Sequence, residues 1–455
     1  MSRRIVITGL GGVSGFGFGF APLWEGLVAG RSALAPITRF DAGGFPSRLA
    51  AEARDFAAKD HVPKHYRKAV KVMARDIELA VGAAKSAVLD AGLVTRATLS
   101  EKGAEAQDTA LTYPPSRMGC HIGAGLIATE IDELTPAVAS ARAEGGGFDV
   151  RAWGDDEGGK GGMNNLQPLW MLKYLPNMLA CHVTILHGAE GPSNTITCAE
   201  ASGLLSLGES VRVIERDAAD LCFSGGAESR ITFMGLQRLG MLGRLAPTGA
   251  VTDGSTLVRP YDLNAPGQLL GEGGGILVLE ERECARKRGA KVYAEVAGFG
   301  AAQSGRTALH AGVWPDAPGA DEGLRFAIER ALEDAGISAA DVDAIVPHGA
   351  GIRSIDAGEA DALRAVFGPR LAQVPLVTLT PAIGDCMAGA SSIAAGVGAL
   401  CLHHQKLPAR IHHGACPSDL NAGAAPARDA ALRHVLICTS SLGGQNAALV
   451  LRAAG

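Results

Sequence analysis

The sequence contains no pair of cysteines spaced as CxxC, although nine cysteines are scattered over its 455 residues. A disulfide framework is therefore not expected, and the cysteines are predicted to be reduced, buried thiols. No run of about 18 or more uninterrupted apolar residues is present, so no transmembrane helix is expected. The start, MSRRIVITGLGG, has neither the apolar segment nor the cleavage site of a signal peptide. We therefore expect a cytoplasmic protein with no membrane partner.

The chain also lacks an excess of positive charge, since 42 Lys and Arg face 47 Asp and Glu and the net charge is −5 at pH 7. A surface that binds nucleic acid generally is therefore not expected. Apolar residues make up 47% of the chain, and 61 residues are glycine. This composition favours a large core in which helices pack closely on sheets.

A glycine-rich stretch, residues 9–19, follows a predicted buried strand at residues 4–8. Its glycines are spaced irregularly for a dinucleotide-binding loop, and no second strand ends in an acidic residue about 20 positions on. We therefore predict a turn that lets backbones approach, and no cofactor.

Two pairs of adjacent histidines lie near the C-terminal end, His403 with His404 and His412 with His413. Their spacing alone would allow a metal ion, but adjacent histidines at a helix end point apart. We therefore predict solvated side chains and no metal site.

Predicted strands and helices alternate on both sides of about residue 260. This pattern predicts two similar α/β halves, residues 1–260 and 261–455, with an insertion in the first half around residues 94–190. Within the insertion, residues 166–188 form the most apolar segment of the chain. That segment is either core or a subunit interface, and its composition supports the two interpretations almost equally.

The stretch GPSNTITCAEASG, residues 191–203, predicts a turn of small residues that opens a helix, and the residues to 229 complete the helix and a buried strand. Backbone N–H groups point outward at a helix start, and the helix dipole favours negative charge there. Enzymes often place an activated nucleophile at such a turn. This chain has Glu200 at the turn, with Cys198 two residues before it.

Seven motifs follow one another between residues 191 and 446 of a match that runs from residue 4 to residue 451, namely GPSNTITCAEASG, ADLCFSGGAES, RPYDLN, GEGGGILVLEERECARKRGAKVYAEV, PHGAGIRSIDAGEADAL, GDCMAGAS and SSLGGQN. With these motifs in this order, the chain resembles the β-ketoacyl-acyl-carrier-protein synthases of the thiolase fold. The resemblance implies an α/β protein with two similar halves in an α-β-α-β-α layered arrangement. It also implies a dimer and an acyl carrier protein as partner.

In the family that the chain resembles, a cysteine holds the acyl chain, two histidines polarise the malonyl thioester, and backbone N–H groups stabilise the oxyanion. The resemblance places the nucleophile position on Glu200 and the first histidine on His348. The second histidine position falls on Asp385. The nucleophile and one of the two histidines are therefore both replaced.

Further positions follow from the same motifs. The turn of the family that gates the pocket and supplies oxyanion-type contacts falls on Leu442, Gly443 and Gly444, with Leu442 in place of a phenylalanine. The two acidic residues that support the first histidine are kept as Asp356 and Glu359.

Three other groups of the family's pocket are also replaced. Ala350 and Ile352 stand where two threonines hold the phosphopantetheine arm, and Thr380 stands at the lysine position. The thiol, one histidine, the lysine and both threonines are thus missing together from a preserved frame. This combination indicates release from condensing chemistry, because a carboxylate cannot form a durable acyl intermediate.

The favoured hypothesis is a condensation-inactive subunit that resembles the chain-length factors (ketosynthase β subunits) of type II polyketide synthases. Such a subunit pairs as a heterodimer with a Cys-bearing ketosynthase, although a homodimer is left open, and it shapes the tunnel for a polyketide or fatty-acyl chain. The family usually has glutamine where this chain has Glu200. We favour a structural role for Glu200, as a helix cap or as the partner of a cation, over a catalytic one.

Two enzymatic alternatives remain open. One is a malonyl-acyl-carrier-protein decarboxylase that makes a starter unit, with His348 polarising the thioester. The other is an active β-ketoacyl synthase with a non-standard nucleophile, for which Cys198 is the candidate. A shift of two residues at a tight turn aims a side chain elsewhere, which disfavours Cys198. The basic run at residues 282–291 is predicted to be a solvated helix face, with carrier-protein docking as its alternative.

Overall fold

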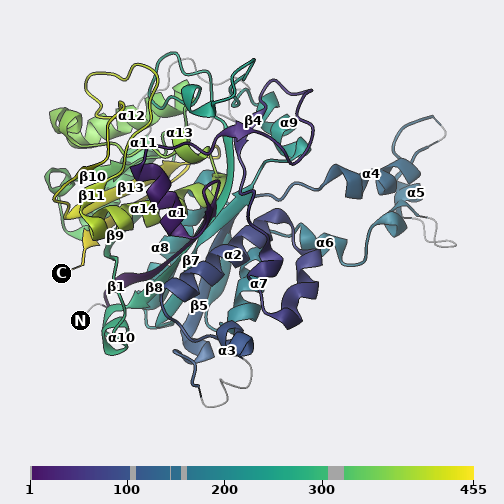
Figure 1. Cartoon of the computed structure of the whole chain (residues 1–455), viewed down its shortest axis with the longest axis horizontal. Helices are drawn as coiled ribbons and strands as arrows, with labels where there is room; N and C mark the ends of the chain where they lie inside the picture. The colour runs from purple at the N-terminus through teal and green to yellow at the C-terminus, as the bar shows by residue number, and fades with distance from the viewer. Residues whose placement is uncertain (1–2, 103–108, 144, 155–160, 306–321, 455) are drawn as a thin grey trace.

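The computed structural model describes residues 3–102, 109–143, 145–154, 161–305 and 322–454 (Figure 1). Its strands are β1 (Ile5–Ser14), β2 (Gly17–Phe18), β3 (Ala35–Pro36), β4 (Leu49–Ala51), β5 (Met118–Ala124), β6 (Ser193–Ile196), β7 (Leu221–Ser229), β8 (Leu270–Glu281), β9 (Ala294–Gln303), β10 (Ala344–Val346), β11 (Lys406–Leu407), β12 (Arg428–Asp429), β13 (His434–Ser440) and β14 (Gln445–Ala453). The α-helices are α1 (Phe20–Val28), α2 (Arg75–Asp90), α3 (Arg96–Lys102), α4 (Ile131–Ser140), α5 (Val150–Gly154), α6 (Trp170–Lys173), α7 (Met178–His187), α8 (Ser202–Glu215), α9 (Phe233–Met241), α10 (Arg282–Lys287), α11 (Glu322–Ala335), α12 (Arg353–Phe367), α13 (Thr380–Ile383) and α14 (Ala390–His404).

Helices and strands alternate in layers, as the resemblance predicted. The long strands pair in the order β10-β13-β14-β9-β1-β8-β7-β5-β6. Helix α2 packs on the outer face of β1, β8 and β7, while α11 packs on the outer face of β9 and β14. Between the two sets of strands lie α8, which packs on β5 and β7, and α14, which packs on β8 and β13. The α-β-α-β-α arrangement is therefore confirmed (Figure 1).

The middle layer is apolar on all sides because strands cover both of its faces. Nearly every residue of α14 up to Leu402 is buried, and α8 buries ten of its fourteen residues. A helix that is apolar all round is typical of a buried layer rather than of the surface. Both central helices begin at the site that is described below, so their packing determines where its side chains lie.

The predicted division at residue 260 stays a prediction. Strand β8, which follows that residue, pairs antiparallel with β1 on one side and with β7 on the other. By its pairing, β8 lies among the strands of the first half. Strand β1 also pairs antiparallel with β9, through Ile5–Ile7 and residues 294–296.

The predicted glycine turn at residues 9–19 is wrong over its first part, because β1 runs through the glycines to Ser14. The reason is packing against α2. A Cβ added to Gly11 would lie 1.9 Å from the carbonyl oxygen of Ala83 and 2.2 Å from the amide nitrogen of Ala87. Glycine is needed here for the close approach of a strand to a helix, not for a turn.

Other predicted elements are confirmed. Residues 433–451 form a hairpin in which β13 and β14 pair antiparallel. The stretch after residue 191 contains a helix, α8, and then a buried strand, β7, and it also contains the short strand β6 before the helix.

Part of the predicted insertion projects from the body as an arm, formed by α4, α5 and the 3-10 turn at Gly162–Asn165 (Figure 1). The apolar segment at residues 166–188 divides between two environments. Helix α7 buries Leu179, Val183 and Leu186 against the body, whereas Leu169 and Met171 are exposed beside the arm. The described helices include none that is both long enough and apolar enough to cross a membrane.

The contact between Gly11 and α2 gives a test of the fold. We expect Gly11→Val to lower the free energy of unfolding by about 3 kcal/mol or more, because a side chain there overlaps the α2 backbone. Thermal or chemical denaturation measures the change. Gly44→Ala is the control, since a Cβ there meets nothing within 4 Å. Equal stability of the two variants would contradict the packing argument.

Candidate functional site

The turn that carries Glu200 is a strained 3-10 turn, Ala199–Ala201, between β6 and α8. Ala199 has φ 46, a left-handed value that a residue with a Cβ rarely adopts. The hydroxyl of Ser202 braces the turn, since it donates to the carbonyl of Ala199 at 2.7 Å and accepts from the amide of Cys198 at 2.8 Å. The turn directs the side chain of Glu200 into the interior, where the residue is 0% exposed.

Glu200 is paired with a cation that sequence reasoning missed. Its Oε1 lies 2.6 Å from Nη2 of Arg244, and both side chains are buried. Its Oε2 accepts a hydrogen bond from the amide of Leu442 at 3.2 Å. Of the two structural roles expected for Glu200, pairing with a cation is observed, while no side chain caps α8.

Arg244 lies in the segment that follows α9, and it is fully buried. The backbone of that segment is held to residue 268, because the amide of Gln268 donates to the carbonyl of Arg244 at 2.9 Å and the amide of Ala246 donates to the carbonyl of Gln268 at 2.9 Å. The side-chain oxygen of Gln268 also accepts from Nη2 of Arg244 at 3.2 Å. The segment after α9 and the segment at residue 268 together place the guanidinium of Arg244 at the nucleophile turn.

Asp385, at the second histidine position, joins the same cluster. Its Oδ2 lies 3.8 Å from Nη2 of Arg244 and 3.6 Å from Nε2 of His348. Its Oδ1 accepts from the amide of Met387 at 2.8 Å. Burial would raise the pKa of Asp385, but His348 and then Arg244 outweigh that effect and hold the pKa below its usual range.

His348 follows β10 and is held by the acids that the sequence assigned to it. Glu359 accepts the amides of His348 and Gly349, both at 2.9 Å, and the hydroxyl of Tyr261 at 2.8 Å. Burial would lower the pKa of His348, but the facing Asp385, with Glu200 and Glu359 farther off, raises it to about 9. The imidazole is therefore protonated at neutral pH, as the partner of a carboxylate.

Asp356 has a backbone role in the same region. It accepts the amides of Tyr261 at 2.9 Å and of Gly351 at 3.1 Å, and burial raises its pKa to about 7. Asp356 and Glu359 thus shape the loop after β10 through hydrogen bonds to its backbone amides.

The turn at Leu442, Gly443 and Gly444 lies where the motif predicted, against the nucleophile position. Its rear is anchored to the end of β9, because the side chain of Gln303 donates to the carbonyl of Gly443 at 2.9 Å and the amide of Ser304 donates to the carbonyl of Gly444 at 2.7 Å. The Leu442 amide, to which the resemblance assigns an oxyanion-type contact, donates its hydrogen bond to Glu200.

The two cysteines next to the site, Cys198 and Cys386, lie in surroundings that favour the thiol over the thiolate. Burial raises the pKa of the Cys198 thiol, and a thiol rather than a thiolate is a poor nucleophile. Cys386, beside Asp385, is fully buried, and burial together with Asp385 raises its pKa further. The described residues also contain no group of three or more His, Cys, Asp or Glu that could hold a metal ion.

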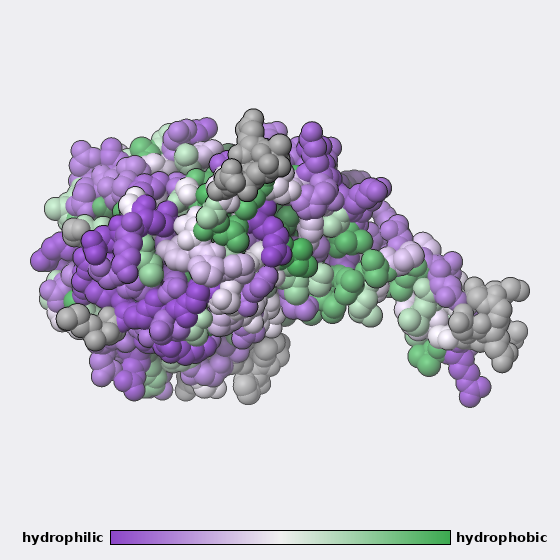
Figure 2. Space-filling model, turned by 90° about the horizontal axis from the view of Figure 1, so that it is seen from below, coloured by the Kyte–Doolittle hydropathy of each residue, from purple (hydrophilic) through white to green (hydrophobic). Residues whose placement is uncertain are grey.

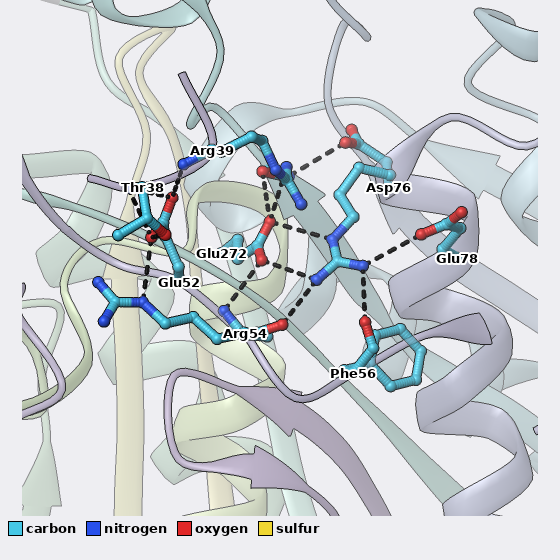
Figure 3. A network of polar contacts seen from close by, with 11 residues as sticks. Thr38, Arg39, Glu52, Arg54, Phe56, Asp76, Glu78 and Glu272 are labelled. Atoms are coloured by element: carbon cyan, nitrogen blue, oxygen red, sulfur yellow. Dashed lines mark hydrogen bonds and ion pairs between the residues drawn. The ribbon is translucent and has the colours of Figure 1, made fainter. Parts of the chain in front are cut away.

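A second buried charge network supports the site from the side of β8 (Figure 3). Glu272 accepts Arg75 Nη2 at 2.8 Å, pairs with Arg39 Nη1 at 3.1 Å, and accepts the hydroxyl of Ser229 at 2.9 Å. Burial would raise the pKa of Glu272, but its bonds to Arg75 outweigh burial and lower it. The preceding residue, Gly271, donates its amide to the carbonyl of Asp385 at 2.9 Å. The network therefore fixes the start of β8, to which the backbone of Asp385 is hydrogen-bonded.

The residues brought together are thus Glu200, Asp385, His348 and Leu442, and the residues that sequence reasoning missed are Arg244 and Gln268. The signal in the sequence was weak. Arg244 is one basic residue in the apolar stretch LGMLGRLAP, with no motif around it. Its role becomes visible only because it is buried, since a buried guanidinium requires a carboxylate.

The pKa of His348 gives a pH test. A group whose pKa rises on folding stabilises the protein fully below its unfolded pKa, here 6.5, and loses that contribution as pH rises through its folded pKa, about 9. We therefore expect the stability difference between the unsubstituted chain and His348→Gln to be largest below pH 6.5 and to shrink, by on the order of 3 kcal/mol, as pH approaches 9.

Chemical denaturation at a series of pH values measures this difference. His413→Gln, at an exposed histidine, is the control and should show no such trend. A difference that grows with pH would contradict the pairing of His348 with Asp385.

Comparisons with known proteins agree with this frame. The model of the β-ketoacyl synthase N-terminal domain matches residues 2–285, and that of the C-terminal domain matches residues 293–413. The chain is 28% identical over 453 residues to 3-oxoacyl-[acyl-carrier-protein] synthase 2 of Staphylococcus aureus (strain COL), covering 99% of this chain and 98% of that protein. It is 31% identical over 455 residues to the putative polyketide beta-ketoacyl synthase 1 of Streptomyces halstedii, covering 99% and 98%.

Among solved structures, the ishigamide ketosynthase/chain length factor superposes with a TM-score of 0.79 at 29% identity, and each chain is covered completely. The chain therefore has the thiolase fold and resembles the ketosynthases and chain length factors of polyketide and fatty acid biosynthesis. Because family models match both halves, the chain belongs to the β-ketoacyl synthase family.

Proposed function

We propose that this chain is a condensation-inactive subunit of the chain-length-factor type. It pairs with a Cys-bearing ketosynthase and shapes the tunnel for a polyketide or fatty-acyl chain. The observation that carries the proposal is the buried ion pair of Glu200 with Arg244 at the nucleophile position. A carboxylate paired with a guanidinium cannot replace the thiolate as a nucleophile. If a carboxylate were acylated, the product would be an anhydride, which does not retain an acyl chain.

The second support is the pairing of His348 with Asp385. Decarboxylative condensation uses two histidines to polarise one thioester. Here the second position holds a carboxylate, which lies 3.6 Å from His348 and would repel a developing oxyanion. The same arrangement weakens the case for a malonyl decarboxylase.

The sheet offers an edge for pairing with a related chain. Strand β6 ends the strand order, and among the described strands it pairs only with β5. Ser193 and Asn194 on this strand are exposed. Unpaired backbone groups at such an edge pair readily with a strand of another chain.

An apolar surface lies where the arm leaves the body (Figure 2). Exposed large apolar side chains of the described residues between 118 and 190 include Leu126, Val150, Leu169, Met171 and Ile185. A surface of this kind is typical of a protein interface. Between α4 and α9 the surface is hollowed into a cavity of about 480 Å³ that is mainly apolar, with Ile131, Leu134 and Val138 in its lining. In the proposed heterodimer these side chains face the growing chain.

A co-expression experiment tests the pairing. We expect this chain, produced with a ketosynthase that has cysteine at the equivalent position, to purify as a one-to-one heterodimer by size exclusion and native mass spectrometry. The pair should condense acyl and malonyl units on carrier proteins, and this chain alone should show no turnover. Glu200→Ala in this subunit should not abolish turnover by the pair, whereas cysteine replacement in the ketosynthase should.

Other outcomes would decide against the proposal. Turnover by the purified chain alone would show an active synthase. Release of carbon dioxide from malonyl carrier protein, lost in His348→Ala, would show a decarboxylase. Only homodimers or monomers in the presence of the ketosynthase would contradict the pairing.

A carrier protein is the second proposed partner, and a basic surface supports it. Five cations around the 3-10 helix Lys64–Val72 are exposed and form no ion pair with a described residue: Lys59, Lys64, Arg67, Lys68 and Lys71. Carrier proteins are acidic, so unpaired cations attract them over a Debye length of roughly 10 Å.

The basic run at residues 282–291 has fewer unpaired cations to attract a carrier protein. Arg286 pairs with Glu283 at 2.8 Å, Lys291 pairs with Asp90 at 2.8 Å, and Arg288 is bound to Glu280. Most of its charge is therefore neutralised within the chain, as expected of a solvated helix face.

Charge reversal separates the two surfaces. We expect the triple variant Lys64→Glu, Arg67→Glu, Lys68→Glu to bind an acidic carrier protein at least ten-fold more weakly at low ionic strength, because attraction becomes repulsion. The effect should shrink at high salt. The control variant Arg282→Glu, Arg286→Glu, Lys287→Glu changes the net charge equally. Binding is measured by fluorescence anisotropy on the heterodimer, and an equal loss in both variants would contradict docking at residues 59–71.

A further inference from the structure

Arg244 lies at the centre of the site, and neither the fold nor the proposed pairing explains its contacts. It is the largest fully buried side chain among the described residues. Three groups face its Nη2, namely Glu200 at 2.6 Å, Gln268 at 3.2 Å and Asp385 at 3.8 Å. A guanidinium removed from water is costly unless it is paired, so the pair with Glu200 is strongly favoured once the chain folds.

The pair determines where the carboxylate of Glu200 points. One oxygen, Oε1, is held by Arg244, and the other, Oε2, is thereby presented to the amide of Leu442 at 3.2 Å. The backbone carbonyl of Glu200 is held separately, since Ser391 Oγ donates to it at 2.8 Å. The main chain is thus fixed by α14, while the direction of the side chain depends on Arg244.

The Leu442 turn is bound on two sides. Its rear is attached to β9 through Gln303 and Ser304. Within the described residues, its hydrogen bond to the nucleophile turn is the one from the Leu442 amide to Glu200. That amide is also the group that would stabilise a thioester oxyanion at this position. One amide N–H cannot donate its hydrogen bond to a carboxylate oxygen and to a thioester oxygen at the same time.

We infer that Arg244 is the positioning residue that closes this subunit's pocket to acyl thioesters. Arg244 fixes the direction of the Glu200 side chain through the ion pair. Glu200 then accepts the hydrogen bond of the Leu442 amide and holds the turn at residues 442–444 against the nucleophile position. The pocket is therefore closed by an internal ion pair as well as by the loss of its thiol. This inference deepens the proposed function and rests on it.

Hydrogen exchange of the full-length chain tests the inference without any assay of activity. Mass spectrometry of a peptide that spans residues 439–446 reports the Leu442 amide. We expect slow exchange in the unsubstituted chain and at least ten-fold faster exchange in Glu200→Ala and in Arg244→Met. Glu200→Gln keeps the shape of the side chain but has one acceptor oxygen, so it cannot accept both bonds and should also exchange faster.

The double variant Glu200→Ala, Arg244→Met separates positioning from general stability. Removing both charges should recover much of the melting temperature that Arg244→Met loses, because no unpaired charge stays buried. Exchange at Leu442 should nevertheless remain fast, since its acceptor is gone. Arg212→Met, which removes a half-exposed ion pair with Asp334, is the matched control and should leave the turn unchanged.

Two results would overturn the inference. One is unchanged exchange at Leu442 in all Glu200 and Arg244 variants. The other is a double variant that regains both stability and slow exchange, since the pair would then only fill space. Condensation by the unsubstituted chain alone would instead refute the proposed function, and it would do so whatever the exchange rates show.

Discussion

A carboxylate and a guanidinium, both removed from solvent, meet at the point where the two central helices begin. The Glu200–Arg244 pair ties together the turn before α8, the segment after α9 and the turn before β14. Burying two charges is costly unless they are paired with good geometry, and within the described residues Arg244 pairs through Nη2 while its Nε and Nη1 have no hydrogen-bond partner. The elements around the pair are therefore constrained by its electrostatics as much as by apolar packing.

The cluster is balanced in charge. Two carboxylates, Glu200 and Asp385, face one guanidinium and one imidazole whose pKa is raised to about 9. In a condensing enzyme, charge at this place develops during the reaction and is stabilised by groups held in advance. Here two acids face a guanidinium and an imidazole before any substrate is present, and the proposed loss of condensing activity rests on this arrangement.

Much of the frame could be predicted from the sequence, and the misses have physical causes. The hairpin at residues 433–451, the helix after residue 201 and the positions of His348, Asp385 and Leu442 followed from local patterns and ordered motifs. The glycines of β1 suggested a turn, because a glycine that admits a neighbouring helix and a glycine that bends the chain look alike in sequence. Packing also decided which apolar residues near the arm are buried and which are exposed.

The sequence by itself determined the family frame, and its motifs predicted a carboxylate at the nucleophile position, Glu200, and another at the second histidine position, Asp385. Only the tertiary structure decided what the Glu200 carboxylate does. Arg244 lies 44 positions away, and nothing near it in the chain marks it as a partner of Glu200. The pair forms because folding removes both groups from water at the same place. The contacts of a buried charge therefore depend on which groups lie next to it in the folded chain.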